Sequence, residues 1–118
     1  MNSDKLYDLS DITEFIEDDD EQIGYFVSIF IDDVPVMLSN INQAFKSSEY
    51  EQLKFHAHKL KSSIDLFKIK DLQTDIRTIE NLVNDRSDPE KLPALIDKLN
   101  SSLNLAIQQL KKDFNING

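Results

Sequence analysis

The sequence predicts an all-α protein, and three observations carry that prediction. Only two glycines and three prolines occur in 118 residues, so the turn signals that separate β-strands are scarce. Valine and threonine, which favour strands, are sparse. Apolar residues instead recur at three- and four-residue steps, which is the spacing of one face of an α-helix.

The first two helices are expected at residues 11–17 and 19–45. The first is short, and we expect it to cover one part of the fold as a lid. Its apolar side carries Leu9, Ile12, Phe15 and Ile16. Pro35 lies inside the second helix, where a proline removes a backbone hydrogen bond and clashes with the preceding turn. We therefore expect a kink at this point and not two separate helices.

An acidic run at residues 17–21 precedes the second helix. Asp18 and Glu21 have the spacing of a capping box, and carboxylates in a first turn favour the positive end of the helix dipole. A calcium loop is the weaker interpretation, because the run lacks the alternating ligands and the central glycine of an EF-hand. We expect the run to begin the second helix.

Three more helices are expected at residues 48–66, 69–84 and 89–112, each with one apolar stripe. The stripes of the four long helices comprise Ile23, Phe26, Val27, Phe30, Val34, Met37, Leu38, Ile41 and Phe45; Tyr50, Leu53, Ala57, Leu60, Ile64 and Phe67; Ile69, Leu72, Ile76, Ile79 and Val83; and Leu92, Ile96, Leu99, Leu103, Ala106 and Leu110. Long amphipathic helices with short connections pack most naturally as an up-down-up-down antiparallel four-helix bundle. We expect one domain over residues 1–118.

Polar residues mark the expected starts of two of these helices. Ser48 and Glu51 form a capping-box pattern, in which each side chain satisfies a free backbone N–H. Pro89 stands where a first-turn proline is tolerated, with Ser87 or Asp88 as the N-cap.

Charge and composition restrict the class of partner. The formal net charge is −9, from 22 acidic and 13 basic residues, so the surface should repel nucleic acid and anionic lipid. Cysteine is absent, which excludes disulfides and cysteine-based zinc sites and agrees with a reducing cytosol. No signal peptide and no apolar run of about 20 residues is evident. We expect a cytoplasmic monomer without membrane or nucleic-acid partners.

Both histidines, His56 and His58, fall in the expected third helix and miss its buried stripe. Rotation of about 100° per residue brings five side chains around His58. These are Lys54, Phe55, Lys61, Ser62 and Asp65. An accessible neutral imidazole is a competent nucleophile at phosphorus, and Lys61 would neutralise the phosphoryl group. On spacing alone, a pair of surface histidines without chemistry stays an open interpretation.

Other chemistries have little support. The two histidines are separated by two positions and do not share a helical face, so we expect no metal site. The sequence has no glycine-rich phosphate loop, kinase signature or dinucleotide fingerprint, so we expect no autokinase activity.

Residues 57–63, Ala-His-Lys-Leu-Lys-Ser-Ser, resemble the motif of histidine-containing phosphotransfer domains, in which Ala-His is followed by Leu-Lys-Gly-Ser or a close variant. The resemblance extends over about residues 11–112. In that family a long acidic-flanked helix precedes the histidine helix, and two further helices complete a four-helix bundle.

The resemblance implies that His58 accepts a phosphoryl group from a receiver-domain aspartate and relays it to another, with Lys61 as its electrostatic support. The chain would be a carrier and not an enzyme, with response-regulator receiver domains and a hybrid sensor histidine kinase as partners. It would need no cofactor of its own, since the receiver supplies Mg²⁺. The expected docking surface comprises Lys54, Phe55, Lys59, Ser62 and Asp65.

Two departures from the family pattern leave alternatives open. Ser62 and Lys68 stand where the family usually has glycine. Ser62 should preserve access to the imidazole but alter partner fit, and Lys68 suggests a different helix ending. A non-phosphorylated adapter that docks a receiver or another partner is the main alternative. A structural bundle with a contact patch at Phe55, Leu66 and Phe67 is another.

Overall fold

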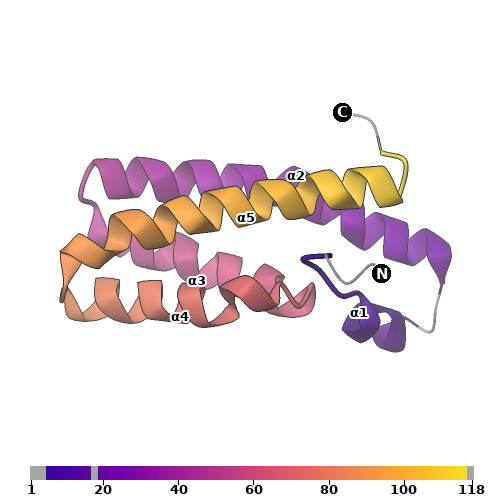
Figure 1. The fold of residues 1–118 in the computed structure, drawn as a ribbon, viewed down its shortest axis with the longest axis horizontal. Helices are drawn as coiled ribbons and strands as arrows, with labels where there is room; N and C mark the ends of the chain where they lie inside the picture. The colour runs from indigo at the N-terminus through magenta and orange to yellow at the C-terminus, as the bar shows by residue number, and fades with distance from the viewer. Residues whose placement is uncertain (1–4, 17–18, 117–118) are drawn as a thin grey trace.

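The fold is that of a computed structural model, which describes residues 5–16 and 19–116. Their elements are α1 (Ser10–Phe15), α2 (Asp20–Lys46), α3 (Tyr50–Leu66), α4 (Lys70–Asp85), a 3₁₀ turn η1 (Pro89–Lys91) and α5 (Leu92–Asp113) (Figure 1). No strand occurs in these ranges, which confirms the all-α prediction.

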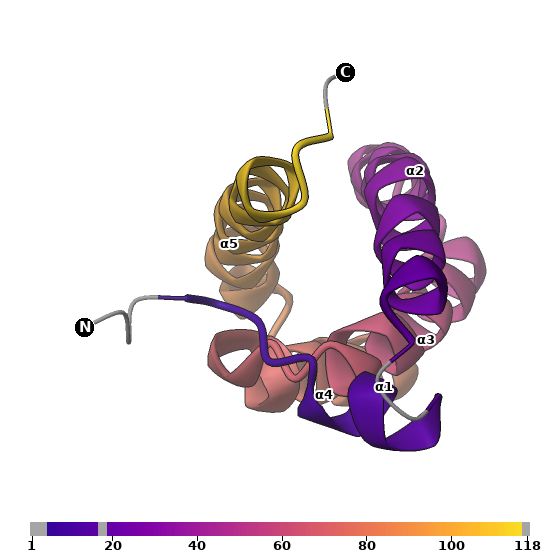
Figure 2. The same cartoon turned by 90° about the vertical axis from the view of Figure 1, so that its right-hand side faces the viewer.

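The four long helices lie along the longest axis of a molecule that measures 43 × 25 × 25 Å. Each of them packs against two others, since α3 contacts α2 and α4, and α5 contacts α4 and α2. Figure 2 shows this closed ring from one end, with α3 and α5 on opposite sides of it. The histidine helix α3 is therefore flanked by α2 and α4.

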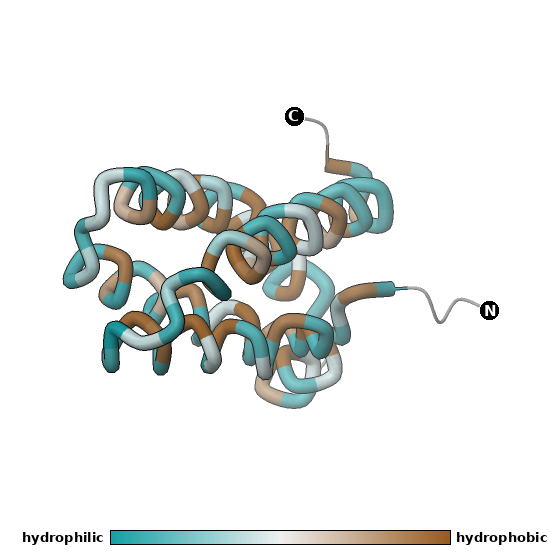
Figure 3. Tube along the Cα trace, turned by 60° about the vertical axis from the view of Figure 1, so that its left-hand side comes forward, coloured by the Kyte–Doolittle hydropathy of each residue, from teal (hydrophilic) through white to brown (hydrophobic). Residues whose placement is uncertain are grey.

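The apolar stripes meet along the axis of the bundle, as the colouring of Figure 3 shows. Every predicted stripe residue from Leu53 onward is at most 3% exposed. In α2, Ile31 and Ala44 join the core, whereas Phe26, Met37 and Phe45 are only partly buried. Each large side chain removed from water in this way contributes about 1.5–3 kcal/mol, so this core is the main source of stability.

Two aromatic predictions need correction. Phe67 was predicted in the buried stripe and, as an alternative, in a surface patch. It is 2% exposed and its ring centroid lies 4.2 Å from that of Phe30, which confirms the stripe and contradicts the patch. Phe15 was expected on the apolar side of the first helix, yet it is 79% exposed, while Ile12 alone of that helix is fully buried in the core. A helix of six residues turns too few side chains inward to bury the whole predicted stripe.

The segment before α1 ties the two ends of the chain together. Lys5 and Tyr7 both donate to the carboxylate of Asp113 at the end of α5, and the Leu6 amide donates to Gln109 Oε1 at 2.8 Å. These bonds hold residues 5–9 across one end of the bundle, beside α1 (Figure 1).

α2 is one continuous helix through Pro35, as predicted. Its N-cap is Asp19, whose Oδ1 accepts from the amides of Glu21 at 3.0 Å and Gln22 at 3.3 Å; Asp18 lies outside the described residues. By length and composition alone α2 is apolar enough to cross a membrane, contrary to the sequence-based expectation. The core helix of a bundle meets the same criterion, and α2 buries one side of itself against α3 and α5.

Left-handed residues other than glycine follow the four long helices. They are Ser48 (φ 55°), Lys68 (φ 48°), Arg86 (φ 51°) and Asn115 (φ 53°). After α2, the Glu49 amide donates to the Ala44 carbonyl at 2.9 Å and closes the turn. Ser48 therefore ends α2, and the predicted capping box with Glu51 was wrong, because α3 begins at Tyr50 without a side-chain cap.

The end of α3 also differs from the expectation. Lys68 adopts the left-handed conformation that a glycine would take, although this costs a residue with a Cβ about 1–2 kcal/mol. The Ile69 amide donates to the Ile64 carbonyl at 3.0 Å, which is a standard glycine-type helix ending. The Lys68 ammonium lies 3.4 Å from Asp11 Oδ1, so a tertiary contact accompanies this conformation.

The entry to α5 corrects the fifth predicted helix. Pro89 begins the 3₁₀ turn η1 and not the α-helix, which starts at Leu92. Asp88 precedes the turn with φ 43°, but its side chain makes no cap hydrogen bond. Asp88 therefore occupies the predicted N-cap position, but of the 3₁₀ turn and without a side-chain cap.

Candidate functional site

His58 lies in the middle of α3 with its side chain 66% exposed. Its neighbour Ala57 is fully buried in the core, so the backbone under the imidazole is held by the bundle. His56 is half-buried and its ring packs edge-on to Phe55 at 5.2 Å. The two histidines therefore have different surroundings, and His58 is the more accessible.

A carboxylate from the neighbouring helix connects the two residues expected to carry the chemistry. Glu80 of α4 places Oε2 at 2.7 Å from His58 Nδ1 and Oε1 at 2.9 Å from Lys61 Nζ. We call this arrangement the Glu80 clamp. A carboxylate only accepts hydrogen bonds, so Nδ1 carries the proton and Nε2 carries the lone pair of the neutral ring. In the neutral ring the clamp thus leaves Nε2 as the nitrogen with a free lone pair.

The clamp also determines the charge of Glu80. Burial by itself would raise the pKa of this carboxyl group, since its side chain is only 16% exposed. Hydrogen bonds from Lys61 and His58 outweigh that effect and lower the pKa below its ordinary value. Glu80 is therefore an anion beside His58 at neutral pH.

Sequence reasoning missed Glu80. It lies 22 residues from His58 and on another helix, so no helical period connects the two. A weak signal existed, because Glu80 follows buried Ile79 at the edge of the α4 stripe and α4 is next in sequence to α3. Only the register between the two helices shows which α4 residue meets His58.

The other predicted site residues divide into two groups. Lys54 and Phe55 lie beside His58 and, with Glu51, line a pocket of about 380 Å³. The Lys54 ammonium is bonded to Asn84 Oδ1 of α4 at 2.7 Å. Phe55 is 57% exposed. This group extends the exposed surface of His58 toward the start of α3.

The second group continues along α3 in the opposite direction. Asp65 accepts two hydrogen bonds from Arg77 of α4, at 3.1 and 2.6 Å. The Arg77 guanidinium lowers the pKa of Asp65 despite an opposing effect of burial. Asp65 therefore connects α3 to α4 through Arg77. Ser62 is exposed, and the Lys59 ammonium lies 5.6 Å from the Phe55 ring centroid.

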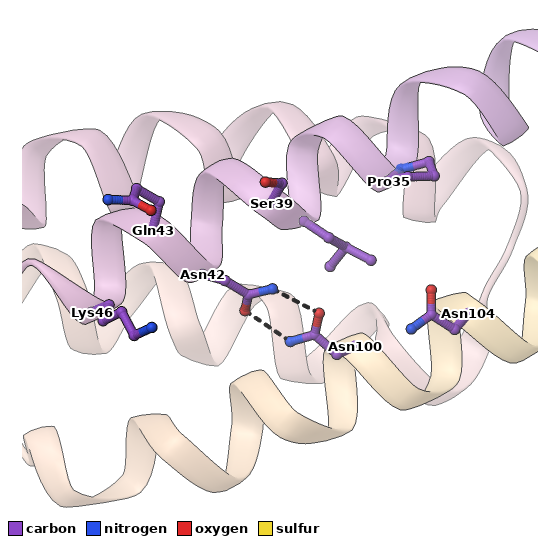
Figure 4. A pocket seen from close by; sticks show the side chains of 8 residues that line it. Pro35, Ser39, Asn42, Gln43, Lys46, Asn100 and Asn104 are labelled. Atoms are coloured by element: carbon purple, nitrogen blue, oxygen red, sulfur yellow. Dashed lines mark hydrogen bonds between the residues drawn. The ribbon is translucent and has the colours of Figure 1, made fainter.

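Another groove, also of about 380 Å³, lies between α2 and α5 and contains neither histidine. Figure 4 shows its polar lining, in which Asn42 and Asn100 exchange two hydrogen bonds at 3.0 and 2.9 Å. Over residues 5–16 and 19–116, no group of three or more histidine, aspartate or glutamate side chains is arranged to hold a metal ion.

Comparison with known proteins agrees with this geometry. A family model described as the Hpt domain matches residues 26–113, from the first third of α2 to the end of α5. No curated protein and no solved structure matches the chain at a significant level. The family match covers most of the chain and includes His58, Lys61 and Glu80. The chain therefore belongs to the Hpt family, the histidine-containing phosphotransfer domains of two-component phosphorelays.

Proposed function

We propose that this protein is a phosphorelay carrier that accepts a phosphoryl group on His58 from the aspartate of one receiver domain and passes it to the aspartate of another. The Glu80 clamp is the observation that supports this most directly. It bonds to Nδ1 of an exposed imidazole, so that Nε2 carries the lone pair of the neutral ring, and it holds a lysine one turn away. Members of the Hpt family act in phosphorelays with receiver domains and kinases, as carriers and not as enzymes in the usual sense.

The transfer step follows from the clamp. Nε2 of His58 attacks the phosphorus of an aspartyl phosphate, the new N–P bond forms, and the P–O bond to the aspartate breaks. The aspartate leaves as a carboxylate, and the ring becomes an Nε2-phosphoimidazole with its proton still on Nδ1. Glu80 Oε2, at 2.7 Å, balances the positive charge that the ring gains. The reverse step delivers the group to the next receiver.

Lys61 supports the phosphoryl oxygens. Its ammonium lies 2.9 Å from Glu80 in the unphosphorylated protein, one helical turn from His58. A rotation of its side chain would move this charge from the carboxylate to the phosphoryl group. The receiver would supply the Mg²⁺ and the remaining positioning, so the carrier would need no cofactor of its own. We likewise propose that it lacks autokinase activity and that a hybrid sensor kinase starts the relay.

The finer features of the fold belong to the same proposal. The family resemblance supports an up-down-up-down order of the long helices, with α1 as a lid at one end. Composition and the closed set of apolar stripes support a cytoplasmic monomer, which would present Lys54, Phe55, Lys59 and Ser62 to the receiver. Asp65 is less suited to docking, because Arg77 already binds its carboxylate.

The test is transfer from a phosphorylated receiver domain in the presence of Mg²⁺. The wild type should acquire an acid-labile phosphoryl group, which His58→Gln loses and His56→Gln retains. His56→Gln is a matched control, because it removes an imidazole from the same helix. No label on the wild type with several receivers would contradict the proposal.

An adapter that docks a receiver without being phosphorylated is the second candidate. Exposed Ser62, in place of the usual glycine, is the observation that favours it, because its side chain enlarges the surface beside His58. In that case wild type and His58→Gln would bind a receiver equally tightly and neither would be labelled.

A further inference from the structure

A pocket shares His58 as one of its walls, together with Glu51, Lys54 and Phe55. We propose that a receiver domain inserts an apolar side chain into this pocket, and that Phe55 thereby determines which receivers the carrier accepts. The inference rests on the proposed function and specifies one contact of its partner.

Phe55 is held in place although it is 57% exposed. The imidazole of His56 packs edge-on against its ring at 5.2 Å, and the Lys59 ammonium lies 5.6 Å from the ring centroid. An ordered aromatic ring loses little conformational freedom on binding, and such rings are frequent among the residues that dominate protein interfaces. Phe55 therefore has the properties of an interface anchor.

The charges around the pocket favour an apolar occupant over a charged one. Lys54 directs its ammonium to Asn84 Oδ1 at 2.7 Å, which fixes that charge against α4 and leaves the aliphatic part of the side chain to line the pocket. Glu51 adds one negative charge to the same lining. Because Lys54 and Glu51 oppose each other, neither a cation nor an anion gains a clear electrostatic advantage. The Phe55 ring remains as the dominant surface.

The position of the pocket specifies the partner. In-line transfer requires the reacting atoms to approach within about 3–3.5 Å, so a receiver that reaches Nε2 must also cover the adjoining wall of the pocket. Leu105 is an exposed apolar side chain without this continuity, since it is 48% exposed but lies on α5, across the bundle from α3 (Figure 2).

The experiment compares Phe55→Ala with Leu105→Ala, which shortens an apolar side chain of similar exposure away from His58. Receiver affinity is measured by titration calorimetry, and transfer from the phosphorylated receiver is measured over a range of receiver concentrations. Thermal unfolding checks that both variants fold. Phe55→Ala should raise the Kd and the KM about tenfold and leave the rate at saturation unchanged. Phe55→Leu should recover most of the affinity, and Leu105→Ala should match the wild type.

The failures of the two proposals are distinguishable. Unchanged affinity and KM in folded Phe55→Ala would overturn the pocket assignment, even if the wild type transfers phosphate normally. A lower saturating rate with unchanged KM would also overturn it, because Phe55 would then act on His58 and not on the partner. A wild type that binds receivers but accepts no label would overturn the proposed function, and the affinity of Phe55→Ala would still decide the pocket.

Discussion

The two sides of the bundle are built differently. Between α3 and α4, charged and polar side chains cross the interface at three levels, through Lys54–Asn84, the Glu80 clamp and Asp65–Arg77. Between α2 and α5, an amide pair, Asn42–Asn100, crosses an open groove. Both sides share the same apolar core.

The difference separates stability from chemistry. Exposed ion pairs such as Asp65–Arg77 contribute little to folding, with a median of about 0–1 kcal/mol, so the apolar core holds the bundle together. The effect of the polar contacts between α3 and α4 is to restrict the side chains near His58 to defined positions. The α2–α5 side has no reactive side chain to position. There the amides of Asn42 and Asn100 hydrogen-bond to each other. The apolar core stabilises both sides, whereas the polar contacts between α3 and α4 position the side chains around His58.

The largest effects should be equal on the two sides, because they come from the shared core. Leu60 of α3 and Leu103 of α5 are both fully buried. Truncation of either to alanine should lower the free energy of unfolding by about 2–5 kcal/mol, from lost burial and the cavity left behind. Urea unfolding measures this. If Leu60→Ala lowered the free energy of unfolding and Leu103→Ala did not, the two sides would not share one core.

The next effect should appear on one side only. Glu80→Gln weakens the hydrogen bonds to His58 and Lys61, and bonds to charged groups are worth about 1.5–3 kcal/mol. The rate of phosphoryl transfer should fall about tenfold or more, in rapid-quench measurements with a saturating receiver. Asn100→Ala on the α2–α5 side is the control and should transfer at the wild-type rate. Equal rates for wild type and Glu80→Gln would remove the clamp from the proposed mechanism.

The ends of α2 and α3 offer a smaller comparison. Ser48 and Lys68 are both left-handed, with φ 55° and 48°. Ser48→Gly should stabilise the protein by about 0.5–1 kcal/mol, because relief of the strained conformation exceeds the added flexibility of the unfolded chain. Lys68→Gly should gain less, since it also removes the contact with Asp11. Chemical unfolding distinguishes the two, and a larger gain from Lys68→Gly would contradict this order.

The smallest effect concerns pH. The pKa of Glu80 is lowered on folding, so the stability it contributes is present above its ordinary value of 4.5 and is lost as the pH falls through the folded pKa. Between about pH 5 and pH 3 the wild type should therefore lose more stability than Glu80→Gln, which does not titrate there. Asn42→Ala, which removes an amide, should follow the wild-type profile. Identical slopes for wild type and Glu80→Gln would contradict the assigned shift.

Helical periodicity predicted most of the fold. The helix expected at residues 19–45 extends over Asp20–Lys46, and the one expected at 69–84 extends over Lys70–Asp85. Predictions failed mainly at the turns. Ser48 has a capping-box partner in sequence, but the turn that closes α2 requires it to be left-handed. Competing local patterns of this kind are decided by the packing of the helices that the turn connects.

The candidate site was predictable to a similar degree. His58 and Lys61 could be selected because they share a helix, a motif and a position off the buried stripe. Glu80 could not, because a contact between residues 22 positions apart depends on how α3 and α4 are aligned. The same alignment engages Asp65 with Arg77, which sequence periodicity also could not predict.

The amino-acid order thus determines which residues form helices, which face of each helix is buried, and that one accessible histidine lies beside a lysine. These properties repeat with the helical period and need no knowledge of the neighbouring element. Which carboxylate bonds to that histidine follows from the relative register of packed helices. That register minimises the free energy of the whole core, and so only the tertiary structure reveals that Glu80 bonds to Nδ1 of His58.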